Sequence, residues 1–236
     1  DQIVNQAAKI HFMLGGELSV PMVLRAPSGS GTGAAAQHSQ SLESWFAHVP
    51  GLKVVLPSSP ADAKGLLLAA LDDPNPVIVL EHKLLYKTSG HVPEEMYRTP
   101  IGVSNTVREG SDLTIVATGV MVSRSLEAAA QLASHGIEAA VIDVRTLSPL
   151  DMDPINASVA NTGRLMLVQE APKHVGFMAE VAARVAEGPA IYSLTEPVTR
   201  LCGMDVPIPY APQLEKAVVP QLDDIVEGAK NLMRGV

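Results

Sequence analysis

Residues 52–82, LKVVLPSSPADAKGLLLAALDDPNPVIVLEH, contain a complete strand–helix–strand unit and decide the fold class. The apolar runs at 53–56 and 76–80 predict two buried strands. Between them, SSPAD at 58–62 predicts a helix start with Ser at the cap and Pro in the first turn, and DDPN at 72–75 predicts its end. A helix between two buried strands is typical of a parallel α/β sheet.

The same alternation extends to both sides of this unit. The further expected strands lie at 20–24, 113–118, 139–144, 165–169 and 190–194, and the further expected helices at 1–14, 41–48, 123–134, 151–160, 175–186 and 222–233. Small residues over 26–40 predict a loop. Residues 82–111 interrupt the alternation of strands and helices and predict an interdomain connection. The sequence therefore predicts two α/β domains, the second complete and the first lacking its beginning.

Composition excludes several classes of protein. The 236 residues include 17 Lys and Arg against 25 Asp and Glu, a net charge of -8, which argues against a nucleic-acid binder because phosphates require a positive field. Hydrophobic residues make up 47% and aromatic residues only 3%, which favours helices packed on a parallel sheet over a β-sandwich. One cysteine rules out an internal disulfide framework. No apolar run approaches the roughly 18 residues of a membrane span.

The glycine-rich loop carries the main candidate for chemistry. Gly29-Ser-Gly31-Thr-Gly33 follows a predicted strand, as a dinucleotide fingerprint would, but it lacks the G-x-G-x-x-G spacing, so a close-packed loop is the favoured interpretation. At the end of this loop, His38 lies near the C-terminal side of a parallel strand, where ligand crevices form. A histidine there suits proton transfer or polarisation of a carbonyl. The alternative, a surface histidine or one that only bonds the backbone, stays open on the residues alone.

Two other segments also have open alternatives. Asp72-Asp73-Pro74-Asn75 offers a carboxylate, an amide and free carbonyls that could bind a hard cation, but an ordinary helix stop is the commoner explanation. The three prolines of 207–212 require an extended surface segment. That segment either packs against another domain or subunit, or is a free loop.

Several long motifs in fixed order resemble a known family. They are DQIVNQAAKIHFMLGGELSVPMVLRAPSG (1–29), AAAQHSQSLESWFAHVPGLKVVLPSSPADAKGLLLAALDDPNPVIVLEHKLLY (34–86), GSDLTIVATGVMVSRSLEAA (110–129), VIDVRTLSPLD (141–151), TGRLMLVQEA (162–171) and RLCGMDVPIPYAPQLEKAVVP (200–220). Over its whole length the chain is similar to the beta subunit of the thiamine diphosphate-dependent decarboxylating component of 2-oxo acid dehydrogenase complexes.

The resemblance implies a transketolase-like fold. We expect the C-terminal portion of a pyrimidine-binding domain at 1–92, a linker at 93–111 and a transketolase C-terminal domain at 112–236. It also implies an α2β2 assembly in the bacterial cytoplasm, with an alpha subunit, a second beta subunit and a lipoyl acyltransferase core as partners. Thiamine diphosphate would lie at the α–β interface, with its diphosphate and magnesium held by the alpha subunit. No nucleic-acid or membrane partner is expected.

The resemblance also implies a substrate class and site residues. EHKLLYKTSGHVPEE (81–95) looks most similar to pyruvate and acetoin dehydrogenase beta subunits, with branched-chain 2-oxo acids as the next choice. His38 matches a family histidine that contacts the cofactor-bound substrate and assists acyl transfer to lipoyl. Five positions match residues around a structural potassium ion, mostly through backbone carbonyls: Met22, Ala70, Leu71, Asp73 and Asn75.

One departure from the family pattern concerns a glutamate that bonds the cofactor's aminopyrimidine ring. No residue of 1–236 matches it, since Glu17 and Glu43 lie in the wrong segments. We therefore expect a fragment or a shortened copy of a beta subunit, inactive by itself. The competing hypotheses are a non-catalytic subunit for dimerisation and docking, and a transketolase or deoxyxylulose-phosphate synthase relative. The length of the chain speaks against the last, because those proteins carry both halves on one long chain.

Overall fold

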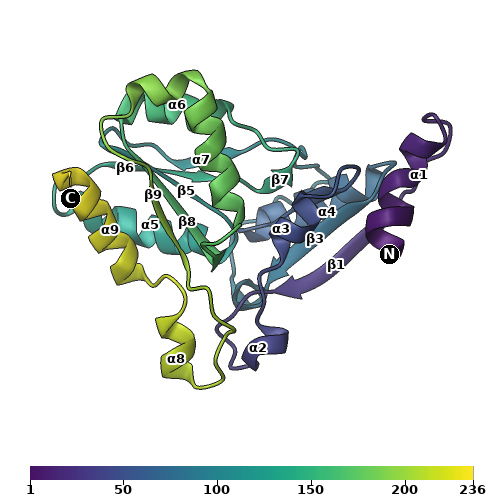
Figure 1. Ribbon diagram of the computed structural model, residues 1–236, viewed down its shortest axis with the longest axis horizontal. Helices are drawn as coiled ribbons and strands as arrows, with labels where there is room; N and C mark the ends of the chain where they lie inside the picture. The colour runs from purple at the N-terminus through teal and green to yellow at the C-terminus, as the bar shows by residue number, and fades with distance from the viewer. Residues whose placement is uncertain (236) are drawn as a thin grey trace.

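The computed structural model describes residues 1–235 and arranges them around two β-sheets (Figure 1). The strand order is β1-β3-β2-β7 in the first sheet and β4-β6-β5-β8-β9 in the second. In chain order the strands are β1 (Val23–Ser28), β2 (Lys53–Val55), β3 (Val77–His82), β4 (Asn105–Arg108), β5 (Leu113–Ala117), β6 (Ala139–Asp143), β7 (Thr146–Ser148), β8 (Leu165–Pro172) and β9 (Thr199–Gly203).

Helices cover both sheets. The α-helices are α1 (Ala8–Met13), α2 (Ala35–His38), α3 (Glu43–Ala47), α4 (Pro60–Asp72), α5 (Val120–Ala133), α6 (Asp153–Thr162), α7 (Phe177–Glu187), α8 (Pro212–Ala217) and α9 (Leu222–Arg234). A π-helical segment, η1 (Gln2–Ala7), precedes α1, and two 3-10 helices are η2 (Lys83–Lys87) and η3 (Pro189–Ser193). Among residues 1–235, no helix has the length and apolar character needed to cross a membrane.

The strand–helix–strand unit at 52–82 forms as the sequence predicts. The backbone N–H of Asp62 donates to Ser59 Oγ at 3.1 Å, which caps α4, and Pro60 follows in its first turn. Strands β2 and β3 then pair in parallel, with Val54 opposite Ile78. The expected α/β fold class is confirmed.

Both sheets are mixed, whereas we expected purely parallel sheets. Strand β7 pairs antiparallel with β2, and β4 pairs antiparallel with β6, so each sheet has an antiparallel edge. Strand β7 comes from the second half of the chain but completes the sheet of the first half. The two halves therefore share one sheet, which joins them through backbone hydrogen bonds.

Three expected segments differ in the structure. Strand β1 starts at Val23 and not at residue 20; it is an edge strand, so it tolerates Arg25 and Pro27. Residues 190–194 form η3 and not a strand, because Gly188 and Pro189 start a tight helical turn there. The strand in that region is β9, and the expected connection at 82–111 contains η2 and β4.

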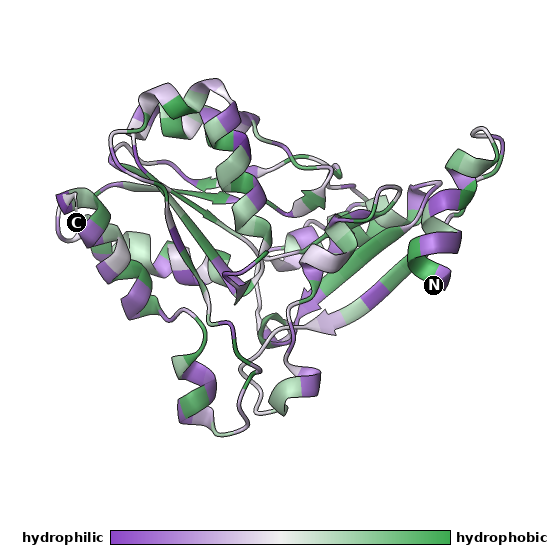
Figure 2. Ribbon diagram, in the orientation of Figure 1, coloured by the Kyte–Doolittle hydropathy of each residue, from purple (hydrophilic) through white to green (hydrophobic). Residues whose placement is uncertain are grey.

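The core passes from one sheet to the other. Side chains alternate along β2 and β3: Val54 and Ile78 join a cluster that also contains Val116 and Ile142 of the second sheet, while Val55 packs under α4. Strand β3, whose side chains are mostly buried, is largely hydrophobic (Figure 2). Helices α6 and α7 cover the shared face of the second sheet, and α5 and α9 cover its other face. This packing fixes the two halves relative to each other.

Candidate active site at the glycine-rich loop

The loop at 29–40 connects β1 to α3 and closes on itself. Gly29 N donates to the carbonyl of Gln40 at 3.0 Å. Gly29, Gly31 and Gly33 have φ values of +86°, +93° and +65°, a backbone region that favours glycine. A Cβ on Gly29 would lie 2.1 Å from His82 Nε2. The expectation of a close-packed loop is therefore confirmed.

Glu170, near the end of β8, binds one side of this loop. One carboxylate oxygen accepts hydrogen bonds from Ser30 N at 2.7 Å and Ser41 Oγ at 3.2 Å, and the other lies 2.9 Å from His82 Nε2. Burial opposes ionisation of Glu170. Hydrogen bonds from His82, Ser30 and Ser41, together with the charge of His82, outweigh the effect of burial. The pKa of Glu170 therefore lies below its usual value. The buried side chain therefore acts as a carboxylate acceptor.

Glu215, on α8, binds the tip of the loop. Its Oε1 accepts from Gly31 N at 2.7 Å and its Oε2 from Gly33 N at 3.1 Å, and the side chain is buried. Helices α2 and α8 accordingly lie next to each other below the two sheets (Figure 1). Loop amides of this kind are the donors that a dinucleotide phosphate would need. Because a carboxylate already binds them, the structure argues against a nucleotide site here.

His38 ends α2, and its side chain is exposed. Its backbone carbonyl accepts a hydrogen bond from Lys83 Nζ, so the chain at His38 is held while the imidazole points to a free surface. Burial lowers the pKa of Lys83, against the opposing charges of Glu170 and Glu215. His38 thus has an exposed side chain on a backbone that Lys83 holds.

A second buried carboxylate lies under the loop. Gln169 Nε2 donates to Glu43 Oε1 at 2.8 Å, and Gln169 Oε1 accepts from Met178 N at 3.1 Å. Burial raises the pKa of Glu43, so this side chain favours its protonated form more than an exposed glutamate does. Of the three buried carboxyl groups near the loop, Glu170 and Glu215 use both oxygens in contacts within the chain, whereas Glu43 uses one.

The predicted potassium residues lie at the other end of the first sheet, the length of a strand away from His38. Met22 precedes β1, and Asn75 precedes β3; six-residue strands such as these are about 20 Å long. Asn75 N donates to Asp73 Oδ1 at 3.0 Å, and the Ala70 carbonyl accepts from Asp73 N at 3.3 Å. The structure thus brings Ala70, Asp73 and Asn75 together.

The chemistry of these donors partly suits a potassium ion. Asn75 Oδ1 is buried and has no hydrogen-bond partner in the described part of the chain, as a ligand oxygen would. The Asp73 carboxylate, in contrast, is paired with Lys53 Nζ. Within residues 1–235 no group of three or more His, Cys, Asp or Glu side chains could hold a metal ion. Carbonyl and amide oxygens are therefore the donors available here.

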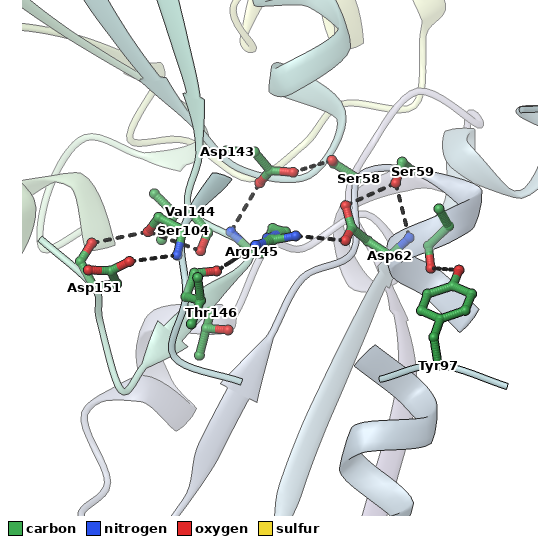
Figure 3. A network of polar contacts seen from close by, with 12 residues as sticks. Ser58, Ser59, Asp62, Tyr97, Ser104, Asp143, Val144, Arg145, Thr146 and Asp151 are labelled. Carbon is green, nitrogen blue, oxygen red and sulfur yellow. Dashed lines mark hydrogen bonds and ion pairs between the residues drawn. The ribbon is translucent and has the colours of Figure 1, made fainter. Parts of the chain in front are cut away.

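A second polar network joins the two halves of the chain (Figure 3). Arg145 Nη1 lies 2.9 Å from Asp62 Oδ1, and Arg145 N donates to Asp143 Oδ1 at 3.0 Å. Ser58 Oγ donates to the other oxygen of Asp143. Burial raises the pKa of Asp143 to about 7, more than Ser58 and Arg145 lower it. Asp143 therefore titrates near neutral pH.

Sequence reasoning missed Glu170, Glu215 and Lys83. Glu170 carried a usable signal, because it follows a predicted buried strand at the sheet edge where α/β ligand crevices form. Glu215 carried none, since it lies 182 residues from Gly33 and only the tertiary fold brings the two together.

Comparison with known proteins identifies the family. The family model for the transketolase pyrimidine-binding domain matches residues 2–89, and that for the transketolase C-terminal domain matches residues 102–225. The whole chain is 49% identical to the beta subunit of acetoin:2,6-dichlorophenolindophenol oxidoreductase from Cupriavidus necator, and covers 69% of that protein. The chain belongs to the pyruvate and acetoin dehydrogenase beta subunits.

Other members of this beta-subunit family are similarly close. Identity is 48% to a mitochondrial pyruvate dehydrogenase E1 beta subunit of Oryza sativa subsp. japonica, with 98% of this chain and 62% of the relative covered. It is 46% to the acetoin oxidoreductase beta subunit of Bacillus subtilis, with 99% and 68% covered. The chain thus spans 62–69% of the length of these relatives.

A solved structure shows the same fold. It is described as a split gene transketolase, inactive beta4 tetramer, and superposes with a TM-score of 0.76 at 22% identity, covering 98% of this chain and 74% of its own. At that identity the likeness establishes the transketolase fold and nothing more about this chain.

The beta-subunit family depends on thiamine diphosphate, which prompts a test of the residues present. Glu43 accepts from Gln169, Glu170 binds Ser30 and His82, and Glu215 binds Gly31 and Gly33. Each of these buried carboxylates thus accepts at least one hydrogen bond from within the chain, and both oxygens of Glu170 and of Glu215 have partners.

Proposed function

We propose that this chain acts as the beta subunit of a thiamine diphosphate-dependent enzyme that oxidatively decarboxylates pyruvate or cleaves acetoin, and passes the acyl group to lipoyl. The observation that carries the proposal is identity of 46–49%, over essentially the whole chain, to beta subunits whose names state these two activities. The exposed imidazole of His38 supports it, since acyl transfer to a lipoyl group needs a proton donor that an incoming partner can reach.

The proposed role of His38 is that of an acid–base catalyst. Its backbone is held through the carbonyl by Lys83, while its ring lies on the surface and can exchange a proton with the sulfur of an approaching lipoyl group. We propose that the carboxylate that binds the aminopyrimidine ring comes from outside residues 1–236, because no glutamate within them matches the family position. Magnesium and the diphosphate would be held by the alpha subunit.

Exposed apolar surface supports the proposed partners. Met204, Val206, Tyr210 and Leu214 all stay exposed along the segment that leads into α8, beside the helix that carries His38. A cavity of about 840 Å³ lies between α3 and α7, and exposed Trp45 and Val175 line it. Apolar patches of this kind are typical of subunit interfaces. We assign them to an alpha subunit and a second beta subunit of an α2β2 assembly, with a lipoyl acyltransferase core as the third partner.

We also propose a bound potassium ion, a linker between the domains and a cellular location. A potassium ion would be held by backbone carbonyls of Met22, Ala70, Leu71 and Asp73 and by Asn75 Oδ1, the buried oxygen that has no partner among the described residues. A linker at 93–111 would separate the two domains. A cytoplasmic location in a bacterium follows the bacterial acetoin relatives, although the plant relative is named as mitochondrial.

The experiment is reconstitution with an alpha subunit. The full product of the gene that encodes residues 1–236, the alpha subunit, thiamine diphosphate and magnesium are combined, and dye reduction is measured with pyruvate, acetoin and a branched-chain 2-oxo acid. Turnover of pyruvate or acetoin supports the proposal. Turnover of the branched-chain acid alone would change the proposed substrate to a branched-chain 2-oxo acid. No turnover of any of the three would favour a non-catalytic docking subunit.

A second arm of the experiment uses residues 1–236 alone with the same alpha subunit. We expect no turnover, because no glutamate of residues 1–236 matches the one that binds the aminopyrimidine ring in the family. Full activity of this shorter protein would contradict the assignment of that carboxylate to residues outside 1–236.

A further inference from the structure

The carboxylate of Glu215 connects the C-terminal half of the chain to the loop that carries His38. We infer that Glu215 is a positioning residue: it holds Gly31 and Gly33 and thereby fixes the place of His38 for acyl transfer. The inference rests on the proposed function, because it assigns His38 the catalytic role. The sequence left open whether the 207–212 proline segment packs against another domain, and it did not single out Glu215.

Both oxygens of the carboxylate take part in this contact. Oε1 accepts from Gly31 N at 2.7 Å and Oε2 from Gly33 N at 3.1 Å, and the side chain is only 4% exposed. The amides of Gly31 and Gly33, with Thr32 between them, both face this one carboxylate, and both glycines have positive φ values. Because two oxygens hold two amides, the contact fixes the orientation of the loop tip as well as its distance.

The helix between this contact and His38 is too short to hold itself. Helix α2 has four residues, no side-chain cap and a positive φ of +59° at Ala35, and isolated helices need about 12–15 residues to be even marginally stable. Its position therefore depends on anchors at its two ends. Glu215 binds Gly33, two residues before α2, and Lys83 binds the carbonyl of His38 at its last residue.

The anchors contact only the backbone, so the His38 side chain remains available to a partner. A displacement of about 1 Å in a catalytic group can cost roughly a hundredfold in rate. Loss of the Glu215 contact releases one end of α2 without removing any side chain of the loop. The expected consequence is a slower acyl transfer with little change in the earlier steps.

The test uses Glu215→Gln and Glu215→Ala in the reconstituted enzyme. Gln keeps one acceptor oxygen but turns an NH2 group toward the second glycine amide, and Ala removes both acceptors. We expect the maximal rate of acylation of a lipoyl domain to fall about tenfold to a hundredfold, with Ala worse than Gln. The KM for the lipoyl domain and the rate of dye reduction should each change by less than about threefold, since substrate binding and decarboxylation do not need the loop tip.

A double-mutant cycle separates positioning from general destabilisation. If Glu215 acts through His38, then Glu215→Gln should cost less than about twofold in acyl transfer once His38→Ala is present. Glu138→Gln, which removes an exposed carboxylate paired with Arg108, serves as the matched control and should leave the rate unchanged. An equal loss with and without His38, or an unchanged rate in both Glu215 variants, would overturn the inference.

Hydrogen exchange keeps the inference testable even without turnover. In Glu215→Gln the amides of residues 31–38 should exchange about tenfold or more faster than in wild type, while the exchange rates of the β5 amides should not change. Unchanged exchange in the loop would show that Glu215 does not hold it. A wild-type assembly without any activity would instead contradict the proposed function, and the exchange rates alone would then decide whether the carboxylate fixes the loop.

Discussion

His38 combines a fixed backbone with an exposed ring, a combination that suits a group working on a mobile partner. We predict that His38→Ala lowers the rate of acyl transfer to a lipoyl domain by roughly a hundredfold or more, the usual worth of acid–base assistance. Binding of thiamine diphosphate should persist, because no buried group moves. Pre-steady-state acylation of a free lipoyl domain measures the first effect, and titration of the cofactor measures the second.

The matched control for this variant is His135→Ala. His135 is also exposed, but it follows α5 and its Nδ1 lies 2.9 Å from the Gln131 carbonyl, far along the chain from the loop. It should leave acyl transfer unchanged. Equal rates for wild type and His38→Ala would refute the catalytic assignment.

Asp143 gives the protein a pH-dependent stability. Its pKa of about 7 in the folded protein lies above the ordinary value of 3.8 for an aspartate, because burial disfavours the charged form. Its contribution to stability is therefore fully present below about pH 4 and is lost as the pH rises through about 7. A shift of this size corresponds to at most about 4 kcal/mol of unfolding free energy.

We predict that Asp143→Asn removes this dependence. The amide keeps an acceptor for Arg145 N and cannot ionise. The free energy of unfolding of the variant, relative to that of wild type, should therefore increase from pH 5 to pH 8. Urea unfolding at both pH values measures the difference, with Asp223→Asn, an exposed position on α9, as the control. A constant difference between wild type and Asp143→Asn at the two pH values would be incompatible with a pKa near 7.

Strand β7, from the second half of the chain, pairs with β2 of the first sheet. Leu147 at its centre is buried in the core that the two sheets share. We predict that Leu147→Ala lowers the free energy of unfolding by about 2–5 kcal/mol, the usual cost of such a cavity. The transition should stay single, with the same midpoint by far-UV circular dichroism and by fluorescence of Trp45 on α3. Leu18→Ala, which truncates an exposed leucine, should have little effect.

Two separate transitions in Leu147→Ala would contradict this prediction. They would show that the second sheet unfolds independently of the first, and that the core does not couple them.

Buried, regularly spaced elements were predictable from the sequence, whereas edges and contacts between distant segments were not. The unit at 52–82 was correct because Val54, Val55 and Val77–Leu80 form clear apolar runs bounded by a cap and a helix stop. Strand β9 was missed because Arg200 and Cys202 give an edge strand no apolar run. The apolar stretch at 190–194 was misassigned because Pro189 starts a 3-10 turn.

The candidate site shows the same division. His38 could be singled out because glycines and a sheet edge surround it in the sequence. Glu170 could have been noticed at the end of a predicted buried strand, but its contact with the loop, like that of Glu215, forms only in the folded chain. The proposed potassium residues share this limit, because backbone carbonyls leave almost no trace in residue types.

The two halves of the chain form one structure with a shared core, a shared sheet and a loop that both halves hold. The first half provides His38, and the second half provides the carboxylates that bind the loop beneath it. Both oxygens of Glu170 and of Glu215 are used in this way. In the proposed function the chain contributes one wall of an active site, and an alpha subunit brings the diphosphate site.

Calorimetric titration of thiamine diphosphate with magnesium tests this central claim most directly. The titration is made into the full gene product, into the alpha subunit, and into a mixture of the two. The structure predicts saturable binding to the mixture, with no comparable binding to the beta-subunit gene product alone. Equally tight binding to the beta-subunit gene product alone, or no binding to the mixture, would contradict the claim.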